Sequence, residues 1–241
     1  MIYQKKYLFL IAISFLLTSF FMTRFQDNPW FSGISGLFIV VFALPSYCSL
    51  LHHLGYRKGG VILVTLSVVP VLVEALAIIT GFPYGGFEYG ERLGWLLFDL
   101  VPPTISFAYL PILLGSIYVA SRITKNIFQF SVLASLFNLA VDLVIDPAAV
   151  HIGFWSYNMG GFFFGVPLSN FIGWIVTGCL YAELFYFIAG EKSLPLPSGV
   201  SVSLLWILCF WLGYLLLNSL YVPGFIGVAL VLYLFRLISL D

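Results

Sequence analysis

The chain contains eight runs of about 20 mostly apolar residues, and these runs constrain its fold more than any other feature. A helix of this length is needed to cross the hydrocarbon core of a bilayer, where every backbone polar group must find a partner inside the protein. Only 8% of the residues are charged and 61% are hydrophobic, unlike a soluble domain. The runs cover roughly residues 7–23, 34–54, 60–80, 102–121, 127–146, 167–189, 200–219 and 223–238.

These runs predict an all-α protein: a polytopic transmembrane helical bundle of about eight helices, or seven if the short final run does not cross. No long linker, low-complexity tract or tandem repeat divides the chain, so residues 1–241 are expected to form a single transmembrane domain. With the N-terminus inside, the positive-inside rule is satisfied, because only Arg24 and Arg92 fall outside. We therefore expect a multi-pass protein of the cell membrane with both termini cytoplasmic. The expected cytoplasmic set is Lys5, Lys6, Arg57, Lys58, Arg122, Lys125, Lys192 and Arg236.

Composition also argues against several partners. The formal net charge is zero and no basic cluster is large enough for a phosphate-binding surface, so we expect no nucleic acid. The three cysteines, Cys48, Cys179 and Cys209, stand singly in apolar runs. The three histidines are equally dispersed, so no metal site is expected and His151 alone lies in a connection where it could act chemically.

Two long connections, about 81–101 and 147–166, fall on the same predicted outer side of the bundle. The first contains GFPYGGFEYGERLGW and the second, counted from Asp146, contains DPAAVHIGFWSYNMGGFFFGVP. Their glycines interrupt regular helix, while their aromatic residues are poor choices for a hydrated loop. We expect both to fold back and cap an intramembrane pocket, since irregular backbone at membrane depth must line a cavity or be buried in protein.

Carboxyl groups within apolar helices are the candidate functional residues. Asn138, Asp142 and Asp146 recur every four residues, which predicts one polar face, and Pro147 predicts the end of that helix. Glu74 is expected at a similar depth, while Glu183 is expected nearer the cytoplasm. A charged acid at the centre of a membrane helix costs roughly 2.5 to 3.5 kcal/mol, so such residues usually face the bundle interior and serve a function. Structural readings stay open: an interhelical hydrogen bond for Asp142 or Glu74, and a local helix-end bond for Asp146.

Buried acids surrounded by aromatic rings favour acid catalysis on a lipid-soluble polyene or isoprenoid. Desolvation disfavours the ionised form of a carboxyl group, which can then act as a general acid and protonate an alkene. Aromatic faces stabilise the resulting carbocation by about 0.5 to 2 kcal/mol each, and a second carboxylate can activate water. The sequence offers no serine–histidine pair, cysteine nucleophile or phosphate-binding glycine loop that would favour another chemistry.

Several motifs resemble the integral-membrane carotenoid hydratase family, which includes the bisanhydrobacterioruberin hydratases and the gamma-carotene 1′,2′-hydratases. They are TGFPYGGFEYGERLG, between Glu74 and Pro103, and DLVIDP with FFFGVPLSNFIGW, between Asp142 and Trp174. The resemblance covers most of residues 70–180. The segment Phe107–Ala108–Tyr109 departs from the expected pattern, in which a tryptophan follows the paired prolines, and this leaves the identity of the carotenoid open.

The resemblance implies carotenoid biosynthesis: cofactor-independent addition of water across the terminal isoprenoid double bond to give a tertiary alcohol. Together with the residues it suggests Asp142 as first and Glu74 as second choice of proton donor, with Asp146 and Asn170 holding and deprotonating water. The expected partners are a carotenoid or similar isoprenoid, water and the bilayer, with association with other enzymes of that pathway left open. The remaining expected substrate-binding residues are Tyr84, Tyr89, Trp155, Phe162, Phe163, Phe164, Asn138 and Trp174.

Three other functions fit parts of the pattern. A carotenoid cyclase begins with the same protonation but captures the cation with an internal double bond. A membrane prenyltransferase is suggested by the spacing of Asn138, Asp142 and Asp146, since carboxylates can hold magnesium against a diphosphate, but a second aspartate-rich motif is missing from the sequence. A proton-coupled transporter also places acids and broken helices within the membrane.

Overall fold

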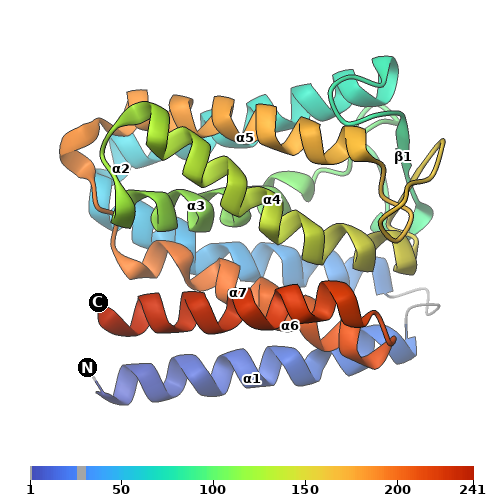
Figure 1. Ribbon diagram of the computed structural model, residues 1–241, viewed down its shortest axis with the longest axis horizontal. Helices are drawn as coiled ribbons and strands as arrows, with labels where there is room; N and C mark the ends of the chain where they lie inside the picture. Colours follow the sequence, from blue (N-terminus) through green and yellow to red (C-terminus); the bar gives the residue numbers. More distant parts are fainter. Residues whose placement is uncertain (1, 26–30) are drawn as a thin grey trace.

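The computed structural model describes residues 2–25 and 31–241, with the side chains of residues 2–6, 8, 31 and 32 outside that description. The described chain forms seven α-helices, three short 3-10 helices and one two-stranded ribbon (Figure 1). The α-helices are α1 (Ile2–Phe25), α2 (Phe31–Thr80), α3 (Ile105–Ile123), α4 (Ile127–Ile152), α5 (Leu168–Ala189), α6 (Val202–Leu217) and α7 (Tyr221–Leu240). The short elements are β1 (Phe87–Tyr89), η1 (Glu91–Leu93), β2 (Trp155–Tyr157), η2 (Glu191–Ser193) and η3 (Ser198–Ser201).

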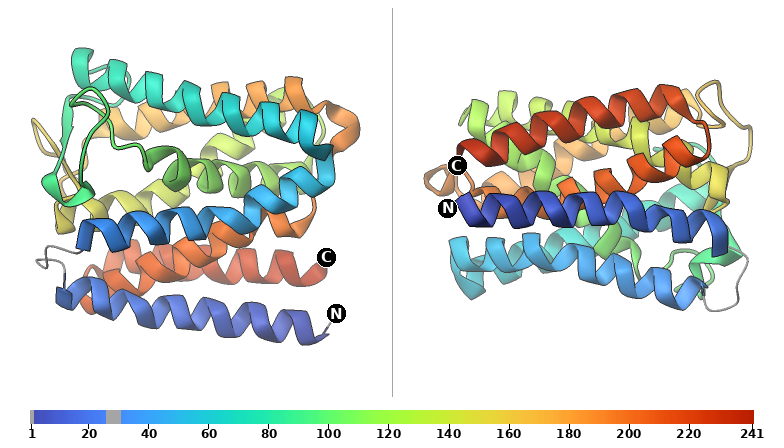
Figure 2. Two further views of the ribbon diagram at one scale, coloured as in Figure 1. Left: turned by 180° about the vertical axis from the view of Figure 1, so that it is seen from behind. Right: turned by 90° about the horizontal axis from the view of Figure 1, so that it is seen from below.

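The all-α transmembrane bundle is confirmed, with seven helices because two predicted runs, 34–54 and 60–80, belong to α2. Gly55 separates two arms of α2 with φ 78° and ψ 158°, a conformation that glycine adopts without steric cost. Figure 2 shows these arms running in opposite directions along the bundle. Six described helices are long and apolar enough to cross a membrane, and α1 contributes the shorter apolar stretch Phe9–Phe25.

Helix α3 lies at the centre of the bundle. Every residue from Tyr109 to Ser121 is buried, and α3 packs against α2, α4 and α6. Around it, α4 packs against α5, and α6 packs against both α1 and α7. The start of α1 and the end of α7 lie at one end of the bundle, and the two long connections lie at the other (Figure 1).

The basic residues follow this polarity. Arg57, Lys58, Arg122, Lys125 and Lys192 belong to helix ends and turns at the end of the bundle where α7 finishes. The predicted Lys5 and Lys6 side chains lie outside the described part of the chain. The basic residues thus gather at one end of the bundle, as the positive-inside rule led us to expect. That this end faces the cytoplasm stays a prediction.

Pro147 does not end the fourth helix, contrary to our expectation. Helix α4 continues to Ile152 and ends where Gly153 adopts a left-handed conformation, with its N–H bonded to the carbonyl groups of Ala149 and Val150. Proline removes one backbone hydrogen bond, a loss that neighbouring helices compensate in a membrane bundle. The second connection therefore begins at residue 153 rather than 147, and Asp146 is not a helix-end residue.

Candidate functional site

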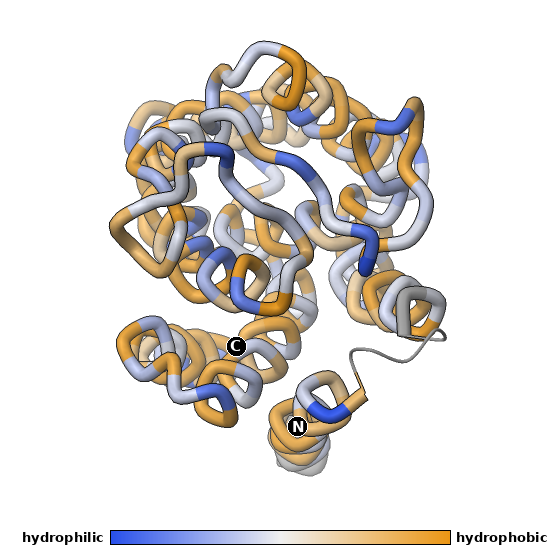
Figure 3. The backbone as a smooth tube through the Cα atoms, turned by 90° about the vertical axis from the view of Figure 1, so that its right-hand side faces the viewer, coloured by the Kyte–Doolittle hydropathy of each residue, from blue (hydrophilic) through white to orange (hydrophobic). Residues whose placement is uncertain are grey.

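The two connections pair as a short antiparallel ribbon. Phe87 of β1 lies opposite Tyr157 of β2, and Tyr89 lies opposite Trp155. Because strand side chains alternate between faces, these four aromatic residues share one face, while Glu88 and Ser156 point away and are exposed. Figure 3, seen from this end, shows hydrophilic stretches in the connections above mainly hydrophobic helices. The aromatic face of the ribbon covers the helix ends and faces inward.

Asn170 connects two acids of α4. Its Nδ2 donates to Asp142 Oδ2 at 3.1 Å and to Asp146 Oδ2 at 2.7 Å. Trp174, one turn later in α5, donates from Nε1 to Asn170 Oδ1 at 3.1 Å, which fixes the amide with its nitrogen toward the acids. All three members of the cluster, Asn170, Asp142 and Asp146, are buried. The polar face predicted for α4 is thus directed at α5.

Each strand of the ribbon supplies one tyrosine to one acid. The hydroxyl group of Tyr157 donates to Asp146 Oδ2 at 2.7 Å, and that of Tyr89 donates to Glu74 Oε2. Glu74 and Asp146 each lie six residues before the end of their helix, about 9 Å along the axis, so the two acids occupy similar depths. Burial is the largest cause that raises the pKa of both phenols above the usual range, and the adjacent acid, Glu74 for Tyr89 and Asp146 for Tyr157, raises it further whenever that acid is ionised. Both hydroxyl groups therefore remain hydrogen-bond donors.

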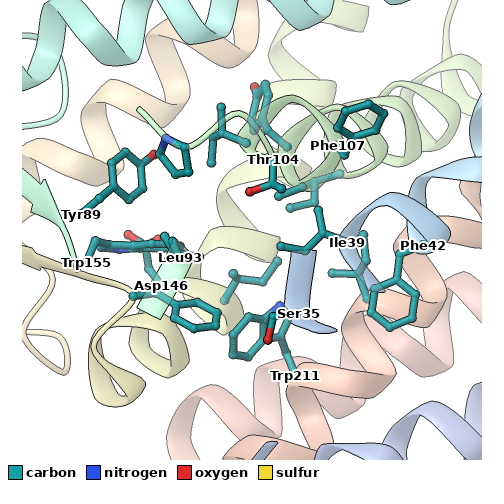
Figure 4. Close-up of a pocket in the computed structure, with 18 of the residues that line it drawn as sticks. Ser35, Ile39, Phe42, Tyr89, Leu93, Thr104, Phe107, Asp146, Trp155 and Trp211 are labelled. Carbon is teal, nitrogen blue, oxygen red and sulfur yellow. The ribbon is translucent and has the colours of Figure 1, made fainter. Parts of the chain in front are cut away.

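An apolar cavity of about 720 Å³ lies beneath the ribbon. Tyr89, Trp155 and Asp146 lie on one side of it, with Phe42 and Phe107 on the other (Figure 4). Seven predicted site residues lie on its wall: Glu74, Tyr84, Tyr89, Asp146, Trp155, Asn170 and Trp174. These residues come from α2, α4, α5 and both connections, which explains why they are dispersed in the sequence.

Tyr84 is held against α5. Its hydroxyl group donates to Thr177 Oγ1 at 3.1 Å, and its ring lies beside Trp174, with 6.4 Å between centroids. Gly173 permits this approach, because a Cβ atom there would lie 2.5 Å from Tyr84 Cδ1 and 2.9 Å from the Pro83 carbonyl oxygen. A glycine at this position thus helps to form the aromatic wall.

Asp142 and Asn138 do not reach the cavity wall. Asp142 lies behind Asp146, and its Oδ1 atom is buried without a hydrogen-bond partner among the described residues. Asn138 lies deeper, where its Nδ2 donates to the hydroxyl group of Tyr109 at 3.4 Å. Asn138 and Asp142 therefore support the wall from behind, through Tyr109 and Asn170 respectively.

The three consecutive phenylalanines lie elsewhere. Phe162 and Phe163 pack against Phe171 on the outside of α5, and Phe164 packs against Phe163. None of the three lines the cavity described above, so the structure does not bring them to the acids. An aromatic run in a loop gives no indication of which face its rings will cover.

Sequence analysis missed several members of the wall. The sequence contains a signal for Tyr157, because Trp155 and Tyr157 alternate along the chain in the same way as Phe87 and Tyr89. Segments of three residues are too short for their pairing as strands to be predicted from that alternation alone. Phe154, Phe210 and Trp211 also line the cavity, and the last two cannot be distinguished from other aromatic residues within the apolar run that forms α6.

His151 is not on the wall, and its Nδ1 lies 2.9 Å from the Tyr214 hydroxyl group. No three His, Cys, Asp or Glu side chains of the described chain form a group that could hold a metal ion.

Comparison with known proteins decides the family. Residues 30–234 match the family model described as carotenoid biosynthesis protein, a range that includes every acid and tyrosine of the site. The chain belongs to this family. It is 35% identical over 164 residues to the bisanhydrobacterioruberin hydratase of Haloarcula japonica, a match that covers 66% of this chain and 54% of that protein. The match thus spans about half the length of this relative. No solved structure matches the chain.

Proposed function

We infer that the protein is a hydratase that adds water across the terminal isoprenoid double bond of a carotenoid, giving a tertiary alcohol. The observation that carries this proposal is the pair of acids Glu74 and Asp146 on the wall of one apolar cavity, each held by a tyrosine of the same ribbon. The name of the Haloarcula relative supports the same chemistry. As in our sequence prediction, the site would lie near the outer face of the cell membrane.

In this scheme Glu74 is the proton donor. Its proton forms a new C–H bond at the less substituted carbon of the double bond, and a tertiary cation develops on the neighbouring carbon. The hydrogen bond that the structure gives Glu74 comes from Tyr89, whereas Asp146 accepts from both Tyr157 and Asn170. Hydrogen bonds donated to a carboxylate favour its ionised form, so Asp146 suits the role of base and Glu74 that of acid.

Three aromatic side chains of the wall suit stabilisation of the cation. Tyr84, Trp155 and Trp174 line the cavity together with both acids. A cation over such faces gains about 0.5 to 2 kcal/mol per ring. The apolar remainder of the wall accepts the hydrocarbon chain of the substrate without unpaired polar groups.

Asp146 and Asn170 would position the attacking water. The water oxygen forms the C–O bond while its proton passes to Asp146, so that one water molecule is added in total. Transfer of a proton from Asp146 back to Glu74 then restores the site, and no cofactor enters the scheme. Asp142, our first choice of donor from the sequence, is instead assigned a positioning role, because it contacts Asn170 behind the wall.

Expression in a host that accumulates an acyclic-ended carotenoid tests the proposal. Mass spectrometry of the pigments should show the gain of one water molecule per converted end. The variants Asp146→Asn and Glu74→Gln should abolish this gain, whereas Glu183→Gln, an acid of α5 that does not line the cavity, should retain it. Product of unchanged mass would indicate a cyclase, and addition of a prenyl unit would indicate a transferase; either result contradicts hydration.

A further inference from the structure

The cavity extends sideways from the acids toward α1. Beyond the acid cluster its wall is formed by α1, the first arm of α2, α3 and α6. Glu74 and Asp146 are the acids on this wall, and the surfaces farther from them are formed by aromatic and aliphatic side chains with the hydroxyl groups of Thr18, Ser35 and Thr104. This part of the cavity is suited to a hydrocarbon chain.

The burial of the wall changes along this direction. Tyr109 and Phe42 are each 7% exposed, whereas Phe21 of α1 and Phe38 of α2 are 60% and 41% exposed. Phe25 and Ile34 line the same region and are also exposed. The cavity therefore reaches the apolar outer surface of the bundle between α1 and the first arm of α2.

Among the described residues, aromatic contacts bridge this gap on the side farther from the ribbon. Phe15 of α1 meets Phe42 of α2 edge to face, with 4.5 Å between ring centroids, and Phe42 also contacts Phe210 of α6 at 5.8 Å. Phe15 and Phe42 lie farther from the ribbon end than Phe21 and Phe38 along their helices. Helix α1 packs mainly against α6, so the opening near the ribbon end is bounded by side chains of α1 and α2 rather than by tight helix packing.

We propose that this opening, bounded by Phe21, Phe25, Ile34 and Phe38, is the route by which a long isoprenoid chain enters sideways from the bilayer. The chain remains in the opening during the reaction, with its end at the acids and its remainder in lipid. The inference rests on the proposed function for the chemistry at the acids. It follows from the continuity of an apolar wall between those acids and a surface that lipid covers. The site then selects the terminal group and tolerates different chain lengths beyond the opening.

Filling the opening provides the test. Ser35 lines the cavity, and Ser35→Trp places a bulky ring in the route. Leu37 is 64% exposed on the same helix and does not line the cavity, so Leu37→Trp is the matched control. On α1, Thr18→Trp is compared with Leu17→Trp in the same way, since Thr18 lines the cavity and Leu17 does not.

Each variant is purified and assayed with two substrates: a full-length acyclic carotenoid, and a short hydrocarbon that carries the same terminal group and fits inside the cavity. We expect Ser35→Trp and Thr18→Trp to lower kcat/KM for the carotenoid at least about tenfold, and to lower it by a smaller factor for the short substrate, which does not occupy the opening once it is bound. Both control variants should stay within about threefold for either substrate. Equal loss on both substrates, or no loss on the carotenoid, would overturn the proposed route.

Binding is measured in parallel through the shift in polyene absorption when the carotenoid enters the protein. Loss of this shift in Ser35→Trp but not in Leu37→Trp supports the route, and an unchanged shift overturns it. Because this readout needs no turnover, it still decides the route if the unmodified protein binds the polyene and does not hydrate it. That outcome would contradict the proposed function alone.

Discussion

The hydroxyl group of Tyr157 donates to Asp146 Oδ2 at 2.7 Å and so joins the β1–β2 ribbon to an acid inside α4. In Tyr157→Phe the carboxyl group keeps its place on the helix and loses one donor. A hydrogen bond to a charged group contributes about 1.5 to 3 kcal/mol, so we expect kcat to fall about tenfold to a hundredfold with the fold retained. Hydration kinetics and thermal unfolding, measured on the same preparation, check this. An unchanged kcat would show that the hydroxyl group of Tyr157 does not contribute to the reaction.

Asp146→Asn should lower kcat more than Tyr157→Phe or Asp142→Asn does. The amide preserves size but cannot accept the proton of water, and loss of a general base typically lowers the rate about 10² to 10⁴-fold. The measurement is kcat for hydration of an acyclic carotenoid. Glu183→Gln is the control, because it also neutralises an acid of a membrane helix without touching the cavity wall. A similar loss in both variants would point to misfolding rather than to lost chemistry.

Asp142→Asn separates the two roles considered for this residue. If Asp142 positions Asp146 through Asn170, we expect a loss of kcat about tenfold smaller than in Asp146→Asn, and a changed pH dependence of kcat. Rate profiles of both variants across the same pH range provide the comparison. If Asp142→Asn loses as much activity as Asp146→Asn, the result would favour Asp142 as the proton donor, which was the first choice from the sequence.

The phenols of Tyr89 and Tyr157 should stay neutral over the whole working pH range. Burial raises the pKa of both groups above the ordinary value of about 10. A raised pKa in the folded state means that their contribution to stability is complete below about pH 10 and is lost as pH rises further. Ultraviolet difference spectra between the protein and the variants Tyr89→Phe and Tyr157→Phe test this. Phenolate absorption from either residue well below pH 10 would contradict the buried arrangement.

Gly173→Ala should loosen the wall of the cavity. The added methyl group would lie 2.5 Å from the ring of Tyr84 and 2.9 Å from the Pro83 carbonyl oxygen, and backbone cannot yield as a flexible side chain does. Overpacking of this kind costs about 1 to 3 kcal/mol, so the Tm in detergent should fall. Gly33→Ala is the control, since a Cβ atom there meets no atom of the described residues within 4 Å. Equal Tm values for both variants would show that the contact has no effect on packing.

Apolar runs and acid spacing predicted much of this molecule. The length of the runs predicted a membrane bundle because each run matches the thickness of a bilayer, and the rule holds regardless of neighbouring segments. Likewise, Glu74 and Asp146 became candidates because acids inside membrane helices usually face protein, and both line the cavity, whereas Asn170 came from the resemblance. These inferences depend on local composition.

The orientation of side chains at the site was less predictable. Each four-residue step along α4 advances by about 40° around the axis, because 3.6 residues complete a turn, so a shared face does not mean a shared cavity wall. Asp146 lines the cavity while Asp142 and Asn138 turn behind it. The β1–β2 ribbon depends on contacts between distant segments, as does the outward packing of Phe162.

The most direct test of the central claim is incubation of the purified protein, in liposomes, with an acyclic-ended carotenoid and water labelled with the heavy oxygen isotope. The account predicts a product heavier by one labelled water per converted end, with the label in a tertiary hydroxyl group. It also predicts that the Asp146→Asn variant forms no labelled product and that the Glu183→Gln variant forms as much of this product as the unmodified protein. A product of unchanged mass, or a hydroxyl group without the label, would contradict the proposal that this site adds water to a carbocation.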